Sequence, residues 1–91
     1  MDDEVREQVS LLPTPAEQAE QREKMDIVLD ALARLPEERR EVLLLRGFQG
    51  LKFEEIAEIL KCSVNTIKGR AFRGIRELRI AVHQLRSERA L

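Results

Sequence analysis

The side chains with the clearest capacity for chemistry are the cations in the last third of the sequence. Residues 61–91 hold eight basic and two acidic side chains, a net charge of +6, whereas the whole chain carries −1 and residues 1–60 therefore carry −7. Such an asymmetry indicates one surface built for an anionic partner and another that is not. A basic helix that is merely exposed to solvent explains the composition equally well. The order of the residues is needed to distinguish this explanation from a binding surface.

Residues that would support catalysis or metal binding are scarce. Cys62 is the only cysteine and His83 the only histidine, so one chain cannot assemble a disulfide or a zinc site from these types. A cysteine nucleophile also needs a base and a group that orients it, and no such group is suggested near Cys62 in its predicted turn. The sequence therefore predicts a protein that is not an enzyme and that holds no cofactor and no metal.

The cations must be positioned by helices, because the composition favours a small all-α domain. The 91 residues include three Phe, four Gly and no Tyr or Trp, which suits amphipathic helices better than a β-sandwich. No apolar run is long enough for a membrane span, and the acidic start lacks the basic and apolar regions of a signal peptide. We therefore expect a soluble, cytoplasmic protein with no membrane contact.

Capping signals predict where the folded part begins. Thr14 is followed by Pro15, and Glu17 stands three residues after Thr14, which completes a capping box at a helix start. Residues 1–14 are therefore predicted to be a linker that precedes the folded part, and residues 15–91 to be a single domain.

Four helices are predicted within that domain. Prolines, glycines and an N-cap at Ser63 give helix ranges of 15–34, 36–47, 53–60 and 64–88. The inner face of the first helix is predicted to comprise Met25, Val28, Leu29 and Leu32. A second apolar set is predicted to pack where the last two helices cross, namely Leu51, Ile56, Leu60, Val64 and Ile67. The fold class is an all-α, four-helix domain with a C-terminal helix-turn-helix and no winged element.

The segment 53–79 has the arrangement of a helix-turn-helix, with a short helix, a tight turn and a second helix rich in arginine. Ala57 is the small residue that lets the second helix cross closely. In this motif the second helix enters the major groove of DNA with its N-terminal residues toward the base edges. An ordinary corner between two helices is the alternative, and the periodicity of the last helix helps to choose between them.

The last helix is predicted to have one apolar and one polar face. At about 100° per residue, its apolar stripe comprises Val64, Ile67, Ala71, Ile75, Leu78, Val82 and Leu85. The opposite side carries Asn65, Thr66, Gly69, Arg73 and Arg76. Phe72 lies about a quarter turn from the stripe. Two roles stay open for it: packing against Phe48 or Phe53, or contacting a thymine methyl group in the major groove.

Candidate DNA contacts follow from the polar face. Cationic side chains supply electrostatic affinity and donate to guanine, which selects Lys68, Arg70, Arg73 and Arg76. Backbone amides at helix N-termini attract phosphate, which adds Ser63 and the pair Lys52 and Phe53. Asn65 and Thr66 add uncharged hydrogen-bonding groups.

The order of these residues resembles region 4 of the bacterial sigma factors of the extracytoplasmic-function group. The resemblance is carried by Leu35-Pro36-Glu37-Glu38-Arg39-Arg40-Glu41-Val42, Leu45-Arg46, Gly50-Leu51, Glu55-Ile56-Ala57 and Ser63-Val64-Asn65-Thr66-Ile67-Lys68-Gly69-Arg70. It covers about residues 26–79 and implies a four-helix domain that binds the −35 promoter element as part of RNA polymerase holoenzyme. It also implies contact with the flap of the polymerase β subunit and capture by an anti-sigma factor.

The resemblance also implies roles for individual residues. Base contacts map onto Lys68, Gly69, Phe72 and Arg73, and phosphate contacts map onto Arg40, Arg70 and the start of the third helix. Three positions depart from the family pattern: Gly69 replaces a usual serine, Asn65 a frequent glycine and Ile75 a frequent arginine. The changes at Gly69 and Asn65 imply an unusual promoter preference, whereas Ile75 fits the apolar stripe and slightly reduces the positive charge. Because 91 residues leave no room for region 2, the chain is expected to be a fragment.

Two other functions fit parts of the sequence. A response-regulator effector domain has a similar helix-turn-helix core and would favour dimers on paired half-sites. The Leu35-Pro36 start and the run from Arg70 to Arg73 fit the sigma pattern better. A protein-docking module would use the same helices to hold an anti-sigma factor or polymerase without touching DNA. Neutralising Lys68, Arg70 and Arg73 discriminates, because loss of DNA binding with partner binding retained supports DNA recognition.

Overall fold

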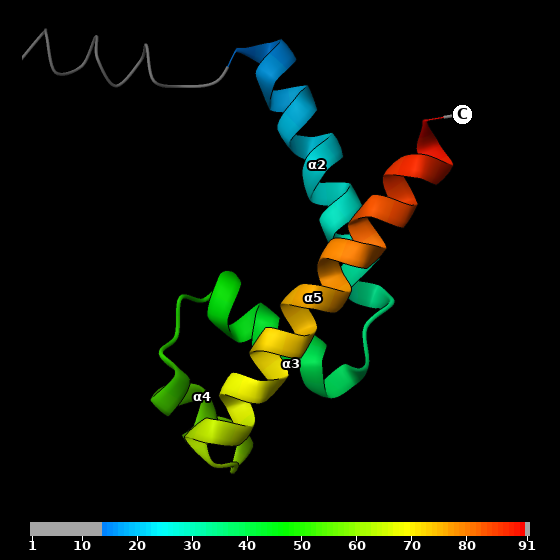
Figure 1. Ribbon diagram of the computed structural model, residues 1–91. Helices are drawn as coiled ribbons and strands as arrows, with labels where there is room; N and C mark the ends of the chain where they lie inside the picture. The colour runs from blue at the N-terminus through cyan, green and yellow to red at the C-terminus, as the bar shows by residue number, and fades with distance from the viewer. Residues whose placement is uncertain (1–13, 91) are drawn as a thin grey trace, which may run out of the picture.

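The computed structural model describes residues 14–90, and within them the chain forms four helices and no strand (Figure 1). The helices are α2 (Pro15–Ala33), α3 (Glu37–Gly47), α4 (Phe53–Leu60) and α5 (Val64–Arg89). The all-α fold and the four predicted helices are confirmed, with each boundary within one residue of its prediction. Residues 1–13, most of the predicted linker, lie outside the described residues.

The start of α2 is held by the predicted capping box. The Glu17 N–H donates to Thr14 Oγ1 (3.2 Å), and the Thr14 N–H donates to Glu17 Oε2 (3.1 Å). Pro15 stands at the first helical position, where its missing N–H costs no hydrogen bond. Two of the amides that a helix start leaves without partners are therefore satisfied by side chains.

The turn between α4 and α5 is tight and locally specified. Lys61 ends α4 in the left-handed region (φ 56°), and the Cys62 N–H donates to the Ala57 carbonyl at 3.0 Å. Ser63 then begins α5, because its Oγ accepts the Thr66 N–H at 3.1 Å. The turn therefore consists of Lys61, Cys62 and Ser63, and it places α5 across α4 as in a helix-turn-helix.

We expect Ser63→Ala to destabilise the fold by about 1 kcal/mol, because the Thr66 N–H would lose the side-chain oxygen that caps it. Urea unfolding followed by far-UV circular dichroism measures the change. Ser63→Asn is the control, since asparagine also caps well, and it should retain most of the stability. Equal losses in the two variants would show that the cap contributes little.

Helix α5 is the axis around which the other helices pack (Figure 1). The N-terminal half of α5 packs against α3 and α4 around a buried cluster of Val42, Ile56, Ala57, Ile67 and Ala71. Its C-terminal half is crossed by α2 around a smaller cluster of Ala31, Ala81 and Leu85. The predicted packing of Leu51, Ile56, Leu60, Val64 and Ile67 is confirmed within the first cluster.

The predicted inner face of α2 is wrong in two positions. Met25 and Leu29 are 44% and 45% exposed, whereas Ile27 is half-buried and Ala31 is completely buried. The reason is geometric: α2 packs mainly on α5 and crosses it at an angle, so the contact is confined to the C-terminal half of α2 (Figure 1). Ala31 and Ala81 belong to the same buried cluster there, and their small side chains let the two helices approach closely.

The predicted apolar stripe of α5 is wrong at Ile75, which is 40% exposed. The buried position beside it is Gly74, which faces α3. A Cβ at Gly74 would lie 3.0 Å from Leu43 Cδ1 and 3.4 Å from Arg39 Cβ. The close approach of α3 to α5 therefore depends on a residue without a side chain, and this rotates the buried face of α5 toward Gly74 and away from Ile75.

Ion pairs tie α5 to α2 and α3 around these clusters. Arg34 Nη2 lies 3.2 Å from Glu88 Oε2, and Arg89 pairs with Asp30 on the same two helices. Arg39 of α3 pairs with Glu77 of α5. Because all of these side chains are at least partly exposed, each pair contributes modestly to stability and mainly fixes the relative placement of the helices.

Candidate nucleic-acid interface

The helix-turn-helix predicted from the sequence is present as α4, the turn and the N-terminal half of α5. The two helices are joined by the buried side chains Ile56, Ala57 and Ile67, which are 0%, 6% and 0% exposed. Ala57 lies in this crossing as predicted. The side of α5 in this half that faces neither α3 nor α4 carries exposed residues, so one face of the second helix is available to a partner.

The exposed face of α5 gathers most of the predicted contact residues. All of the following side chains are exposed: Asn65, Thr66, Lys68, Phe72, Arg73 and Arg76. Gly69 lies among them, half-buried, and a Cβ there would meet nothing within 4 Å. The face therefore combines three cations, two neutral polar groups, one aromatic ring and a gap at Gly69, which is a surface suited to a phosphate-lined groove.

Phe72 is the most exposed of the large apolar side chains described, at 71%. Packing of this ring against Phe48 or Phe53 is therefore not observed, and the alternative of an outward-facing ring holds. Phe53 itself packs against the core cluster, with the Arg46 guanidinium 4.7 Å from the centre of its ring. An outward phenyl group between cations can contact a thymine methyl group, which is one of the apolar features of the major groove.

The capping hydroxyls at the start of α5 also engage each other. Ser63 Oγ donates to Thr66 Oγ1 at 2.9 Å while it accepts the Thr66 N–H. Both side chains are exposed, so their remaining hydrogen-bonding capacity faces outward. The N-terminus of this 26-residue helix has no acidic residue in its first turn. Its positive end is therefore not neutralised locally and can attract a phosphate.

Arg70 differs from the other cations of α5. Its side chain is only 22% exposed, and its Nη2 lies 3.9 Å from Glu38 Oε2 on α3. The structure therefore places Arg70 on the flank between α3 and α5, beside a carboxylate, and away from the exposed face that holds Lys68 and Arg73.

Two of the predicted contact residues outside α5, Arg40 and Lys52, already form hydrogen bonds within the protein. Arg40 is half-buried, and its Nη1 donates to the Ala33 carbonyl at 3.4 Å. The Lys52 N–H at the start of α4 already donates to Glu55 Oε1 at 3.0 Å, and Glu54 also lies in this first turn. Carboxylates here oppose a phosphate, so the start of α4 is a weaker anion site than the start of α5.

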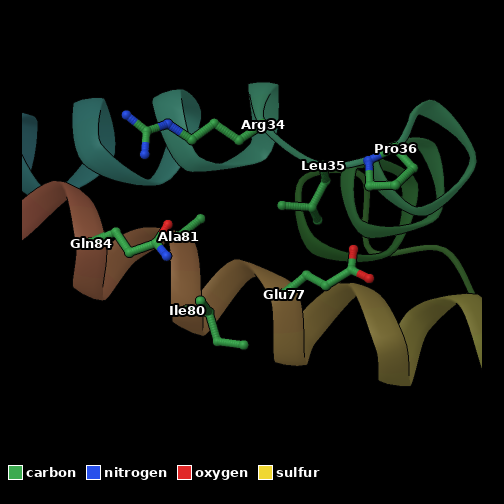
Figure 2. A pocket seen from close by; sticks show the side chains of 7 residues that line it. All are labelled: Arg34, Leu35, Pro36, Glu77, Ile80, Ala81 and Gln84. Atoms are coloured by element: carbon green, nitrogen blue, oxygen red, sulfur yellow. The ribbon is translucent and has the colours of Figure 1, made fainter.

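One surface hollow formed by described residues lies at the connection between α2 and α3. Figure 2 shows this hollow of about 300 Å³ beneath the Leu35-Pro36 connection, with Arg34 on one side and Ile80, Ala81 and Gln84 of α5 on the other. Its carboxylate, Glu77, pairs with Arg39. Residues 14–90 contain no group of three or more metal-binding side chains, and no helix among them is long and apolar enough to span a membrane.

An apolar groove that the sequence pattern does not predict lies between α3 and α4. It has a volume of about 390 Å³ and is lined by Glu41, Leu44, Leu45, Gln49, Ile59 and Leu60. Ile59 is 56% exposed although the sequence pattern counts it among the apolar residues of α4. An amphipathic pattern does not reveal this, because α4 has two turns and its apolar residues extend beyond the side that α5 covers.

Comparison with known proteins gives one consistent family. Residues 25–78 match the family described as Sigma-70, region 4. The chain is 40% identical over 60 residues to an ECF RNA polymerase sigma-E factor of Haemophilus influenzae, covering 66% of this chain and 32% of that protein. It is 44% identical over 46 residues to an RNA polymerase sigma-H factor of Pseudomonas aeruginosa, covering 50% of this chain and 24% of that protein.

A third relative is an ECF RNA polymerase sigma-E factor of Escherichia coli, which is 43% identical over 51 residues. That match covers 56% of this chain and 27% of the relative. The chain thus spans about a third or less of the length of the curated relatives that it matches. The part that matches the family contains the C-terminal half of α2, all of α3 and α4, and the N-terminal half of α5.

Proposed function

The chain belongs to the sigma-70 region 4 family, and from this membership we propose that it binds promoter DNA at the −35 element as part of an RNA polymerase holoenzyme. It acts by binding and has no catalytic role of its own. The unit that does this is residues 15–91, and residues 1–14 are the linker that precedes it. The promoter, the core polymerase and an anti-sigma factor are its partners.

The observation that carries this proposal is the exposed face of α5. A helix-turn-helix presents this face outward, and it holds Lys68, Arg73 and Arg76 with no carboxylate among its exposed residues from Asn65 to Arg76. Cations of this kind neutralise phosphates and donate to guanine, while Asn65 and Phe72 offer contacts to adenine and thymine. The remaining proposed phosphate contacts are Arg40, Lys52, Phe53, Ser63, Thr66 and Arg70, and Gly69 lets the helix backbone approach the bases.

A selection from duplexes with a randomised upstream element tests the proposal. The full chain should enrich a defined sequence at low salt, and the affinity for that sequence should fall as salt rises. Unrelated duplexes should bind more weakly at every salt concentration. Binding that depends on salt but shows no sequence preference would contradict promoter recognition, and binding at paired half-sites as a dimer would support a response-regulator domain.

We expect Phe72→Ala to weaken binding to the selected duplex by about five- to tenfold, because the ring would no longer bury a thymine methyl group. The loss should be concentrated at one base pair when single-base variants of the duplex are compared. Phe48→Ala is the control, since Phe48 is also exposed (54%) but lies at the end of α3. Similar losses in both variants would show that Phe72 does not read a base.

Docking on the flap of the polymerase β subunit is a second role, and the apolar groove between α3 and α4 favours it. Exposed Ile59 provides an apolar anchor of the kind that dominates protein interfaces. We expect Ile59→Gln to weaken binding to a flap fragment by about tenfold and to leave DNA affinity within about twofold. Isothermal titration against both ligands measures this, and parallel losses for flap and DNA would argue against a separate docking site.

A further inference from the structure

Arg70, on the flank of α5, has a carboxylate partner that the cations of the exposed face lack within residues 14–90. Among the described residues, Lys68, Arg73 and Arg76 have no carboxylate within ion-pair distance, whereas Arg70 Nη2 lies 3.9 Å from Glu38 Oε2. Arg70 is also 22% exposed while Glu38 is 74% exposed. Glu38 is therefore the more solvent-accessible member of the pair, and any group that reaches Arg70 from solvent also comes close to this carboxylate.

We propose that Glu38 competes with the DNA phosphate for Arg70 and so limits the affinity of the domain for DNA in general. This inference rests on the proposed function. A guanidinium binds a carboxylate and a phosphate through the same donors, so a phosphate that takes Arg70 must replace Glu38 or tolerate its negative charge nearby. Because phosphates are the same at every sequence, the competition lowers non-specific binding and leaves base contacts unchanged.

The contacts of the neighbouring arginines explain why Glu38 would affect phosphate binding by Arg70 in particular. On α3, Arg39 is already occupied by Glu77, and Arg40 donates to the Ala33 carbonyl. Arg70 is thus the cation of this flank whose partner is a largely exposed carboxylate. An exposed ion pair is worth little in water, so binding to a phosphate can break it at small cost. Glu38 therefore lowers the affinity of Arg70 for a phosphate slightly and does not prevent the phosphate from binding.

The test substitutes Glu38→Gln in the full chain and measures affinity for the selected duplex and for an unrelated duplex over a range of salt. We expect binding to both duplexes to tighten by about two- to fivefold, the range that an exposed ion pair is worth. The plot of log affinity against log salt should become steeper by about 0.9, because one more phosphate would be fully neutralised. In an Arg70→Gln background, Glu38→Gln should change neither quantity beyond the effect of net charge.

Glu37→Gln is the matched control. Glu37 adjoins Glu38 in the first turn of α3, its side chain is exposed, and it forms no ion pair within residues 14–90. The two substitutions change the net charge and the helix N-terminus alike, so their difference isolates the contact with Arg70.

Two results overturn the inference. If Glu38→Gln behaves like Glu37→Gln on both duplexes, Glu38 does not act on Arg70. If Glu38→Gln weakens binding, Glu38 orients Arg70 toward the phosphate and does not compete with it. The proposed function fails separately, when the unsubstituted chain shows no preference for any sequence, and the salt dependence on the unrelated duplex still tests Arg70 in that case.

Discussion

Replacing Lys68, Arg73 and Arg76 together by glutamine is expected to lower affinity for the selected duplex by at least about a hundredfold near physiological salt. These side chains are the exposed cations of the outward face of α5 between Asn65 and Arg76. Each phosphate that loses its cation also removes about 0.9 from the slope of log affinity against log salt, so the slope should fall by up to about 2.7. Fluorescence anisotropy with a labelled duplex measures both quantities.

The choice of these three cations comes from the structure. The charge pattern of the sequence groups Arg70 with Lys68 and Arg73, but Arg70 lies beside Glu38 on the flank of α5. Arg76 replaces it because Arg76 is exposed and forms no ion pair among the described residues.

A control with the same change in charge separates position from net charge. Arg22, Lys24 and Arg86 are exposed cations on α2 and near the end of α5. Their replacement by glutamine should weaken DNA binding only slightly, since long-range attraction is screened within about 10 Å at moderate salt. Equal losses of DNA affinity in the two triple variants would show that binding depends only on the overall charge. The exposed face of α5 would then not be the DNA-binding surface.

Local signals explain why the helices could be predicted closely from the sequence. The capping box at Thr14 and the N-cap at Ser63 depend on residues within one turn, so they carry over directly into structure. The core of the helix-turn-helix was also predictable, because Ile56 and Ile67 fall on the apolar faces of two helices joined by a short turn. Periodicity is informative where a helix packs along most of its length.

The errors concern contacts between segments far apart in the chain. Met25 and Leu29 share a helical face with buried residues, but the crossing angle of α2 on α5 leaves them exposed. Gly74 gives no hydropathy signal, although its lack of a side chain allows α3 to approach α5. The pairing of Arg70 with Glu38 likewise joins residues on two helices, so neither the spacing nor the charge pattern of α5 predicts it.

Ile67→Ala should destabilise the domain by about 3 kcal/mol, the largest loss of stability that we expect from a single substitution. Ile67 is 0% exposed in the cluster where α5 meets α3 and α4, so removing its methyl groups leaves a cavity that surrounding helices fill only partly. A small domain has only about 5–15 kcal/mol of stability, so this is a large fraction of it. Urea unfolding followed by circular dichroism measures the loss.

Ile80→Ala is the matched control for Ile67→Ala, because Ile80 lies on the same helix and is 53% exposed. It should cost well under about 1 kcal/mol, since little apolar area is released to water. The comparison also bears on function: Ile67 points away from the proposed DNA face, so Ile67→Ala should weaken DNA binding only in proportion to the unfolded fraction. A loss of affinity at temperatures where the variant remains folded would mean that Ile67 also sets the angle at which α5 enters the groove.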